Sequence, residues 1–463
     1  MFDSIIIYLK VGEKMYLKRK IDDFLEEWKS KEDRMPLIIK GARQIGKTKS
    51  IKNFANSHYE NVVEINFVLQ EQYRDIFDDG FDVDTILKNI SLKNPDFKFT
   101  PKKTLIFFDE IQRCINCATS LKSFKIDGRF DVICSGSLMG INYNEIESNS
   151  VGYKIDYEMH SMDFEEFLWA KGYKSSQIEE IYICMKQLKP LSKVMMDVMN
   201  ENFRDYLVLG GMPNVVASFI KNKNFSGTLA LQKQLILDYE EDITKYAVGL
   251  DKTKILNVFR KIPVFLGKDN KKFQISKVSH GARNRDYVGT VEWLETAGMI
   301  NTCYCMGDLA LPLKCNYNPD NFKIYFKDTG LLIATLDDEA QNDLRFNKNF
   351  NTYKGAIFEN VVADMLAKQG YPLYFYKNDK GTLKMDFFVR DANSLIPVEV
   401  KAKDGPTISL NNLIDSGKYE DIKYGIKLCD KNIGFNGKIY TFPYFLTFLL
   451  KRFLKEKDIH SNN

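Results

Sequence analysis

Residues 41–48 read Gly-Ala-Arg-Gln-Ile-Gly-Lys-Thr, a complete G-x-x-x-x-G-K-[ST] pattern that follows the short apolar run at 37–39. This pattern, between an apolar strand and a helix, is typical of a phosphate-binding P-loop whose glycines let backbone N–H groups turn inward. Lys47 is expected on the β- and γ-phosphates of ATP, as a binding and catalytic group, and the Thr48 hydroxyl on Mg²⁺. The residues predicted to bind the nucleotide here are Gly41, Ala42, Arg43, Gln44, Ile45, Gly46, Lys47, Thr48 and Lys49.

A second apolar run, residues 104–108, ends in the two carboxylates Asp109 and Glu110. Asp109, at the tip of a strand, is placed to complete the magnesium shell opposite Thr48. Glu110 is then placed to polarise the attacking water as a catalytic general base. The alternative, that both are exposed acids closing a strand, is disfavoured by the P-loop upstream. The pattern therefore predicts ATP binding with Mg²⁺, followed by hydrolysis.

The next predicted strand ends in Ser135-Gly136-Ser137, where the Ser137 side chain is a candidate sensor of the γ-phosphate. Turn formation explains a Ser-Gly-Ser sequence equally well, so both interpretations stay open. Arg113 and Arg129 are candidates for an arginine finger only because they lie close to these motifs in the sequence.

The composition is that of an ordinary globular protein, with 44% hydrophobic and 28% charged residues among 463. The net charge of +4 is too weak to indicate a nucleic-acid partner by itself. Because no run of about 18 apolar residues occurs, we expect no membrane partner and a cytoplasmic location. The Cys114-x-x-Cys117 pair and the Cys303, Cys305 and Cys315 group fit reduced, partly buried thiols better than metal ligands.

Hydrophobic patterning divides the chain into four predicted parts within an α/β multidomain fold. Residues 1–160 alternate strand-like and helical runs, as a parallel sheet covered by helices requires. Residues 161–246 are patterned as helices, and residues 247–345 as short helices followed by a hairpin. Residues 346–463 begin with a helix, continue with strand-like runs and end with a helix.

Motifs spread over nearly the whole chain resemble one family, a group of bacterial and archaeal AAA-type P-loop ATPases with a C-terminal domain of unknown function. The segments that carry the resemblance are 41–48, 108–112, 135–137, 164–168, 210–213, 327–331, 385–387 and 399–401. The resemblance implies a parallel-sheet ATPase core at 1–160, a helical lid at 161–246, a winged-helix segment at 247–345, and a C-terminal α/β domain similar to restriction endonucleases at 346–463. It implies no particular cellular role.

Asp386, Glu399 and Lys401 have the order and spacing of a D…E-x-K nuclease site. If a hairpin turns at residues 391–394, Asp386 lies opposite Glu399, and Lys401 shares their face. The two carboxylates would hold Mg²⁺, and the lysine would polarise a water, so all three are candidate catalytic residues. Glu359, on a predicted helix, resembles the extra catalytic acid of such folds. An ordinary cross-strand charge cluster, or a site without activity, remains the alternative.

Residues 274–279, 283–287 and 288–295 fit a helix-turn-helix, and the hairpin around Cys303 fits a wing. Lys277, Arg283 and Arg285 could contact DNA phosphates. Glu292 and Glu295 on the same predicted helix oppose such docking, so a segment used for packing or protein contact is an equal alternative.

Two functional hypotheses follow from these patterns. The first is an ATPase whose nucleotide cycle controls a C-terminal domain acting on DNA or RNA. The second is an ATP-dependent signalling or regulatory protein, in which the nuclease-like domain is an inactive scaffold for a protein partner. Assembly into an oligomer is compatible with both.

Overall fold

The computed structural model describes residues 15–138, 150–247, 249–268, 270–346, 348, 352–378, 381–401 and 405–461. The chain divides into two compact units. The first takes in the chain up to Ser137, the stretch ending at Met159, and Ala217–Lys223; the second holds His160–Val216 and Asn224–Asn463. The two units are treated separately below.

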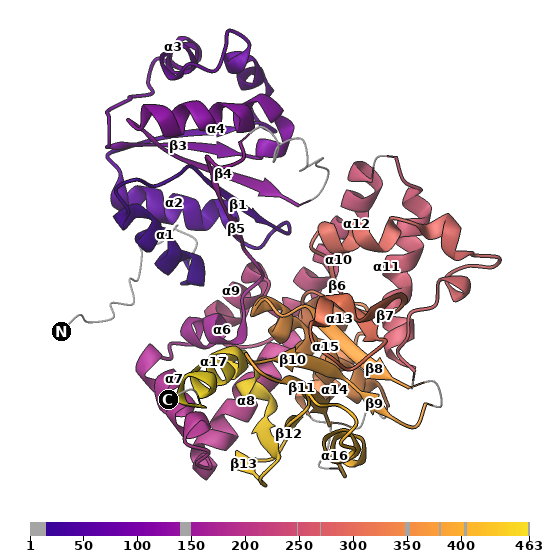
Figure 1. Ribbon diagram of the computed structural model, residues 1–463. Helices are drawn as coiled ribbons and strands as arrows, with labels where there is room; N and C mark the ends of the chain where they lie inside the picture. Colours follow the sequence, from indigo (N-terminus) through magenta and orange to yellow (C-terminus); the bar gives the residue numbers. More distant parts are fainter. Residues whose placement is uncertain are drawn as a thin grey trace. The chain divides into compact units, whose positions relative to one another are not determined.

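A five-stranded parallel sheet in the order β2-β3-β4-β1-β5 organises the first unit (Figure 1). Its strands are β1 (Leu37–Gly41), β2 (Asn61–Asn66), β3 (Thr104–Asp109), β4 (Asp131–Ser137) and β5 (Ile155–Glu158). Its helices are α1 (Lys20–Ser30), α2 (Lys47–His58), α3 (Val83–Lys93) and α4 (Ile115–Asp127), with the 3₁₀ turns η1 (Glu71–Phe77) and η2 (Ile111–Arg113). The predicted parallel-sheet core is confirmed. The edge strand β5 was not predicted, because its alternating Ile-Asp-Tyr-Glu sequence lacks the apolar run of the buried strands.

Helices cover both faces of this sheet, which explains why its central strands are apolar along their whole length. All six residues of β3 are buried. On one face α3, α4 and η1 pack against side chains such as Ile106, Phe108 and Val132. α1 and α2 lie together on the opposite face (Figure 1).

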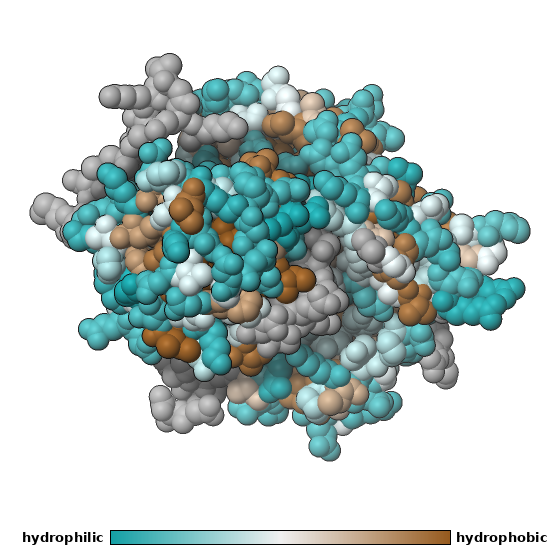
Figure 2. All heavy atoms as spheres, turned by 90° about the horizontal axis from the view of Figure 1, so that it is seen from above, coloured by the Kyte–Doolittle hydropathy of each residue, from teal (hydrophilic) through white to brown (hydrophobic). Residues whose placement is uncertain are grey.

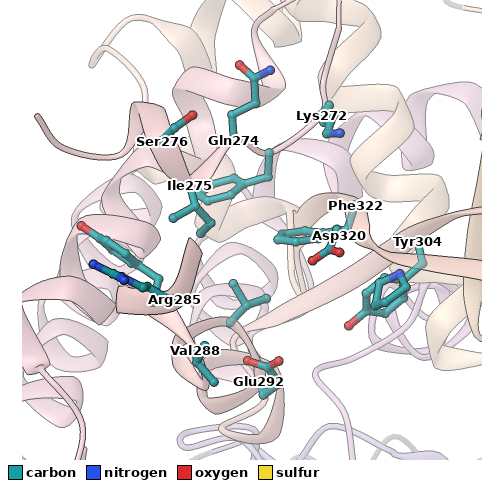
Figure 3. A pocket seen from close by; sticks show the side chains of 14 residues that line it. Lys272, Gln274, Ile275, Ser276, Arg285, Val288, Glu292, Tyr304, Asp320 and Phe322 are labelled. Atoms are coloured by element: carbon teal, nitrogen blue, oxygen red, sulfur yellow. The ribbon is translucent and has the colours of Figure 1, made fainter. Parts of the chain in front are cut away.

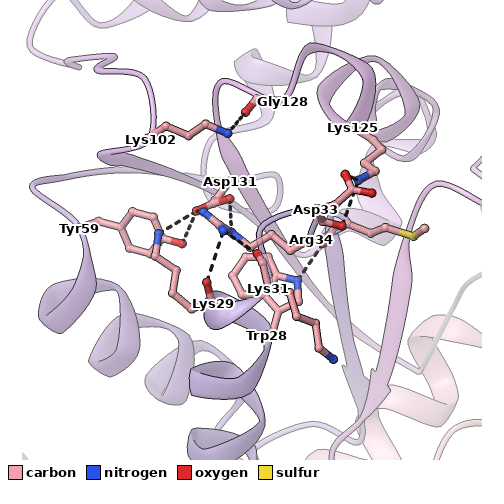
Figure 4. Close-up of polar contacts among 11 residues, drawn as sticks. Trp28, Lys29, Lys31, Asp33, Arg34, Tyr59, Lys102, Lys125, Gly128 and Asp131 are labelled. Atoms are coloured by element: carbon pink, nitrogen blue, oxygen red, sulfur yellow. Dashed lines mark hydrogen bonds and ion pairs between the residues drawn. The ribbon is translucent and has the colours of Figure 1, made fainter.

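Asp131, the first residue of β4, joins α1, α2 and the sheet at the edge away from the P-loop. Its carboxylate accepts hydrogen bonds from Arg34 Nε at 2.6 Å, Lys29 Nζ at 2.9 Å and the Tyr59 hydroxyl at 2.7 Å (Figure 4). Burial alone would raise the pKa of Asp131, but these hydrogen bonds outweigh it and hold the pKa below the ordinary 3.8. The network therefore stabilises the first unit as long as Asp131 is ionised.

The second unit contains most of the helices. From His160 to Tyr246 these are α6 (Phe164–Ala170), α7 (Ser175–Lys186), α8 (Lys193–Leu209), α9 (Pro213–Asn222), which continues into the first unit, and α10 (Thr228–Tyr246). The later helices are α11 (Lys252–Leu266), α12 (Thr290–Thr296), α13 (Thr329–Ala334), α14 (Ala340–Arg345), α15 (Thr352–Lys368), α16 (Ile408–Asp415) and α17 (Leu450–Ser461). Its 3₁₀ turns are η3 (Ile275–Lys277), η4 (Asn284–Tyr287), η5 (Leu313–Cys315) and η6 (Tyr444–Leu449).

The described residues of the second unit form two sheets. The five-stranded sheet has the order β10-β11-β12-β14-β13, and the four-stranded sheet the order β7-β6-β8-β9. The strands are β6 (Ile300–Met306), β7 (Tyr317–Phe326), β8 (Leu373–Lys377), β9 (Lys384–Met385), β10 (Phe387–Arg390), β11 (Leu395–Val400), β12 (Gly425–Cys429), β13 (Gly434–Phe435) and β14 (Ile439–Pro443). Because β6 pairs with β8, the smaller sheet crosses the predicted boundary between residues 345 and 346. The four-part division stays a prediction, with its last two parts sharing this sheet.

A buried carboxylate, Asp328, holds the start of the second unit onto its later part. Its oxygens accept hydrogen bonds from Ser161 Oγ and Gly211 N, both at 2.8 Å, and from Gly330 N at 3.0 Å. A Cβ at position 211 would lie 1.8 Å from Met162 O, so only glycine allows this approach. The predicted helical segment is therefore fixed to the later part of the second unit.

The predicted helix-turn-helix is not confirmed. Residues 274–279 form only the short turn η3, and residues 283–287 only η4, so α12 is the one α-helix of the three expected segments. Gly281 and Gly289 have φ of 75° and 81°, and these left-handed residues interrupt the helical pattern. The predicted hairpin of β6 and β7 does form, but β6 is also paired with β8 and is no free wing. Among the described residues, no helix is both long and apolar enough to cross a membrane.

Replacing Asp131 with Asn should lower the free energy of unfolding of the first unit by about 1–3 kcal/mol at neutral pH. Arg34 and Lys29 would lose the charged acceptor that offsets their burial. Because the folded-state pKa of Asp131 is depressed, its stabilisation is full above its ordinary pKa and is lost as the pH falls below that value. The difference in unfolding free energy between the wild type and Asp131→Asn should therefore become smaller at low pH. Hydrogen exchange of the β4 amides measures it.

Asp84 offers a matched control, since its salt bridge to Arg129 is exposed. Asp84→Asn should change the unfolding free energy by less than about 0.5 kcal/mol. Equal effects of the two substitutions would contradict the role given to Asp131.

Candidate functional site

Residues 41–48 form a tight loop between β1 and α2, and two of its glycines are required by its geometry. A Cβ on Gly41 would lie 2.3 Å from the backbone oxygen of Met159, a distance that no side chain tolerates. Gly46 has φ of 96° and caps the N-terminus of α2, where other residues would be strained. The first helical N–H groups of α2 are therefore available to an anion, and the helix dipole favours negative charge there.

Lys47 folds back over this loop. Its Nζ donates hydrogen bonds to the backbone oxygens of Gly41 at 2.9 Å and Ala42 at 2.7 Å. Burial lowers the pKa of Lys47 to about 8, although the negative charges of Glu110 and Asp109 act in the opposite direction. The ammonium group is thus held inside the loop, and its positive charge is only partly compensated by the protein. This state is expected of a phosphate-binding lysine when no phosphate is bound.

Thr48 and Asp109 meet across the loop, although 61 residues separate them in the sequence. The Thr48 hydroxyl lies 3.4 Å from Oδ1 and 3.3 Å from Oδ2 of the carboxylate. Asn66 Nδ2 donates to Oδ2 at 2.9 Å, and the Ser135 hydroxyl donates to Oδ1. A hydroxyl facing a buried carboxylate supplies the oxygen ligands that Mg²⁺ prefers, so these residues fit the ion.

The other predicted residues of this site lie at the same sheet edge. Ser137, the last residue of β4, is in register with Gly41 of β1. Glu110 follows β3 directly, with φ of 58° and ψ of 45°. Lys49 Nζ donates to Met15 O at 2.5 Å. Arg129, by contrast, lies just before β4 at the opposite edge and pairs with Asp127 and Asp84, so the structure excludes it from this site.

Three residues around the loop were not identified from the sequence. Arg19 is 4% exposed, and its guanidinium donates to the backbone oxygen of Ile45 at 2.7 Å. Asn66 and Ser135 hold Asp109, as described above. Asn66 and Ser135 lie near the ends of their strands, a position that could have suggested them, whereas nothing in the sequence marks Arg19.

A second cluster of charged residues lies in the second unit, at the start of the β10–β11 pair. The β10–β11 register runs from Phe387↔Val398 to Arg390↔Leu395, so the hairpin is centred on the predicted turn, and Asp386 and Glu399 are the next residues beyond the last pair. Asp386 occupies a bend before β10, and its Oδ2 accepts a hydrogen bond from Val400 N at 2.8 Å. Lys401 Nζ pairs with Glu399 Oε1 at 2.7 Å. The structure thus brings together the three residues of the D…E-x-K pattern.

Both carboxylates are poorly compensated. Glu399 is 5% exposed, and its Oε2 is buried without a hydrogen-bond partner. Burial raises the pKa of Asp386, with a further contribution from the charge of Glu359. Burial likewise raises the pKa of Glu399, against the opposing effect of Lys401. A cation would relieve both groups, so two carboxylates fit one Mg²⁺. Among the described residues, however, no group of three or more His, Cys, Asp or Glu is arranged to hold a metal.

Glu359, on α15, is held differently from these two acids. Lys323 Nζ donates to its Oε1 at 2.8 Å, the Tyr325 hydroxyl donates to the same oxygen, and Lys271 donates to Oε2. Burial acts to raise the pKa of Glu359, but the two lysines outweigh it and lower the pKa. Both of its oxygens are therefore engaged by protein donors, unlike those of Glu399.

Three family comparisons match successive parts of the chain. Residues 33–168 match the family described as AAA domain, which includes the loop, Asp109, Glu110 and Ser137. Residues 33–168 form an AAA-type P-loop ATPase domain. Residues 200–342 match a domain of unknown function, DUF8612, and residues 354–445 match another, DUF4143, which includes Asp386, Glu399 and Lys401. No curated protein matches the sequence.

Solved structures of other proteins are similar to this chain. The Walker-type ATPase PABY2304 of Pyrococcus abyssi is 13% identical with a TM-score of 0.40, over 69% of this chain and 96% of that chain. The RuvB Holliday junction branch migration motor of Thermotoga maritima is 14% identical with a TM-score of 0.29, over 61% and 89%. Drosophila ORC bound to DNA is 10% identical with a TM-score of 0.26, over 72% and 95%. These similarities are too distant to carry an argument about function.

Outside the AAA domain, a groove of about 410 Å³ lies between η3, η4, α12 and the β6–β7 pair (Figure 3). Phe273, Tyr287 and Phe322 line it with apolar surface. Of the three basic residues predicted to meet DNA, only Arg285 lines this groove, and Glu292 lines it as well. The groove therefore mixes both charges and shows no basic surface of the kind that phosphate binding requires. The face of the molecule that Figure 2 shows from above is mostly hydrophilic, with hydrophobic residues scattered over it.

The pKa of Lys47 gives a testable property of the AAA domain. In the nucleotide-free protein Lys47 loses its proton near pH 8, whereas bound phosphates would keep it charged. ATP binding should therefore weaken as the pH rises above 8, because binding must then take up a proton. Lys47→Ala should weaken ATP binding about 10- to 100-fold at neutral pH. It should also remove the decrease in ATP affinity above pH 8. Titration with a fluorescent ATP analogue between about pH 7.5 and 9.5 measures both effects.

Lys52 provides the control, because it lies on α2 and pairs with Glu64 on the exposed surface. Lys52→Ala should bind ATP as the wild type does, with the same pH slope. Wild-type affinity in the Lys47→Ala variant would contradict the geometry described here.

Proposed function

We propose that the AAA domain hydrolyses ATP with Mg²⁺, using Glu110 as the general base. The observation that carries the proposal is the approach of the Thr48 hydroxyl to within 3.3 Å of Asp109. Lys47 would donate to the β- and γ-phosphate oxygens in place of its two backbone acceptors, and the α2 N-terminus would bind the same phosphates. Mg²⁺ held by Thr48 and Asp109 would neutralise charge on the phosphates.

The role of Glu110 follows from its position after Asp109. Since Asp109 is occupied by Thr48, Asn66 and Ser135, Glu110 is the next carboxylate along the sheet edge that could accept a proton from water. Ser137, in register with Gly41, would lie beside the γ-phosphate and donate to it. The roles are thus divided among the residues, because Lys47 binds phosphate charge, Thr48 and Asp109 hold the ion, and Glu110 accepts the proton.

Glu110→Gln should reduce the kcat of ATP hydrolysis about 100-fold or more, because the amide cannot accept the proton. ATP affinity should stay within about twofold of the wild type, since the phosphate contacts remain. Steady-state phosphate release with Mg²⁺, and with EDTA added, measures turnover and its dependence on the ion.

Glu27→Gln, on the exposed side of α1, is the matched control and should retain full turnover. A wild-type protein that binds ATP but releases no phosphate would refute hydrolysis and leave a nucleotide-binding module.

We also propose a second activity, Mg²⁺-dependent cleavage of phosphodiester bonds at Asp386, Glu399 and Lys401. The unpartnered Glu399 Oε2 beside a carboxylate with a raised pKa supports it. Asp386 and Glu399 would hold the ion, and Lys401 would orient the attacking water. Glu359, the candidate extra acid, is bound by two lysines and Tyr325, and its charge would act on this cluster by raising the pKa of Asp386. The finer assignments of a winged-helix segment and a restriction-endonuclease-like fold belong to this same proposal.

Asp386→Asn should abolish Mn²⁺ binding at this cluster and any cleavage of DNA or RNA by the full chain. Metal binding should strengthen as the pH rises, because the raised pKa values of Asp386 and Glu399 mean that their protons must leave first. Calorimetric titration with Mn²⁺ and gel assays on DNA and RNA measure the two effects.

Asp415, which forms an exposed ion pair with Lys438, provides the control. Asp415→Asn should change neither Mn²⁺ binding nor the cleavage of nucleic acid. Intact nucleic acid, with no difference between the wild type and Asp386→Asn, would refute this second activity. It would favour the alternative hypothesis of a regulatory protein whose C-terminal part binds a protein partner.

A further inference from the structure

Gln112 lies two residues after Glu110, in the short 3₁₀ turn η2. The left-handed backbone of Glu110, with φ of 58°, turns the chain sharply at the end of β3. Such a conformation is uncommon for a residue with a side chain and is found at sites where geometry matters more than local stability. The turn brings the Gln112 side chain back to the carboxylate of Glu110.

The amide of Gln112 connects two groups of the nucleotide site. Its Nε2 donates a hydrogen bond to Glu110 Oε2 and another to Ser137 Oγ, the latter at 3.1 Å. Glu110 follows β3, and Ser137 ends β4, so Gln112 spans the ends of two neighbouring strands. Both N–H bonds of the amide are used, which fixes the orientation of its plane.

The other end of the same amide has no partner. Gln112 Oε1 is buried and accepts no hydrogen bond. Exchanging the oxygen and nitrogen would not remove this defect, because an oxygen would then face the Glu110 carboxylate. A glutamine that served only to stabilise the fold would be expected to satisfy both ends. The two Nε2 contacts are therefore kept at the expense of a buried acceptor.

We infer that Gln112 is a positioning residue for ATP hydrolysis, which orients the Glu110 carboxylate by linking it to Ser137. The inference rests on the proposed general-base role of Glu110. With Nε2 bound to Oε2, the other carboxylate oxygen, Oε1, is directed to accept the proton of the attacking water. Because Ser137 would contact the γ-phosphate, the same amide couples the position of the base to the presence of that phosphate.

The test is steady-state ATP hydrolysis by the full chain carrying Gln112→Ala, with fluorescent-nucleotide binding and thermal unfolding measured alongside. We expect kcat to fall about 10- to 100-fold while KM and nucleotide affinity stay within about twofold, because only the orientation of the base is lost. Gln187→Ala, at an exposed glutamine after α7, is the matched control and should match the wild type in each measurement.

A second variant, Gln112→Glu, separates positioning from a purely structural role. At low pH the new carboxyl group is protonated and can still donate to Glu110, whereas at high pH two carboxylates repel each other. Its kcat should therefore decline relative to the wild type as the pH rises. A structural role alone would give a loss that does not depend on pH.

The outcomes distinguish this inference from the proposed function. A wild-type chain that does not hydrolyse ATP overturns both. Hydrolysis by the wild type, with an unchanged or increased kcat in Gln112→Ala, overturns the inference alone, and so does a pH-independent loss in Gln112→Glu. A loss of nucleotide affinity equal to the loss of kcat also overturns it, because Gln112 would then act on binding.

Discussion

Backbone pairing between parallel strands β1, β4 and β3 is the constraint on which the nucleotide site depends. Parallel strands end at the same edge of a sheet, so the pairing brings Gly41, Ser137 and Asp109 together from segments far apart in the chain. Helices on both faces keep these strands buried, and their N–H and C=O groups can only pair with one another. The edge of the sheet is therefore rigid, and the loop at 41–48 has a fixed partner in Asp109.

Because the sheet edge is rigid, the AAA domain can keep the charged side chains of Asp109 and Lys47 buried beside each other. Asp109 is 4% exposed, yet it accepts hydrogen bonds from Thr48, Asn66 and Ser135. Lys47 is 8% exposed and bonds only to backbone oxygens, with its pKa lowered by burial. The charge of Asp109 is thus compensated by hydrogen-bond donors, whereas the charge of Lys47 meets only neutral backbone oxygens in hydrogen bonds. This imbalance favours the binding of an anion. Arg19 contributes by holding the backbone at Ile45, which keeps the loop curled before any ligand binds.

Sequence patterns predicted what is local or periodic. The glycine spacing predicted the loop, the apolar runs predicted β1, β3 and β4, and turn residues 391–394 predicted the centre of the β10–β11 hairpin. Contacts made by single side chains across the fold could not be predicted, among them Arg19 on Ile45, Asn66 on Asp109 and Gln112 on Ser137. The helix-turn-helix expectation was not confirmed for a related reason. Its polar and apolar spacing was compatible with helices, but Gly281 and Gly289 adopt left-handed conformations that end them.

The two acidic sites differ in how their charges are compensated, and this difference bears on what each can do. Around Asp109 the protein supplies donors from three elements, so the carboxylate is stable whether or not an ion is bound. At Asp386 and Glu399 burial dominates, the pKa values are raised, and Glu399 Oε2 has no donor at all. A buried carboxylate of this kind is costly unless it is protonated or bound to a cation. Lys323 and Lys271 are hydrogen-bonded to Glu359 and act on Asp386 only through their charge, which does not outweigh its burial. Lys401 pairs with Glu399 Oε1, so the further charge that would stabilise Asp386 and Glu399 Oε2 is a proton or a bound cation.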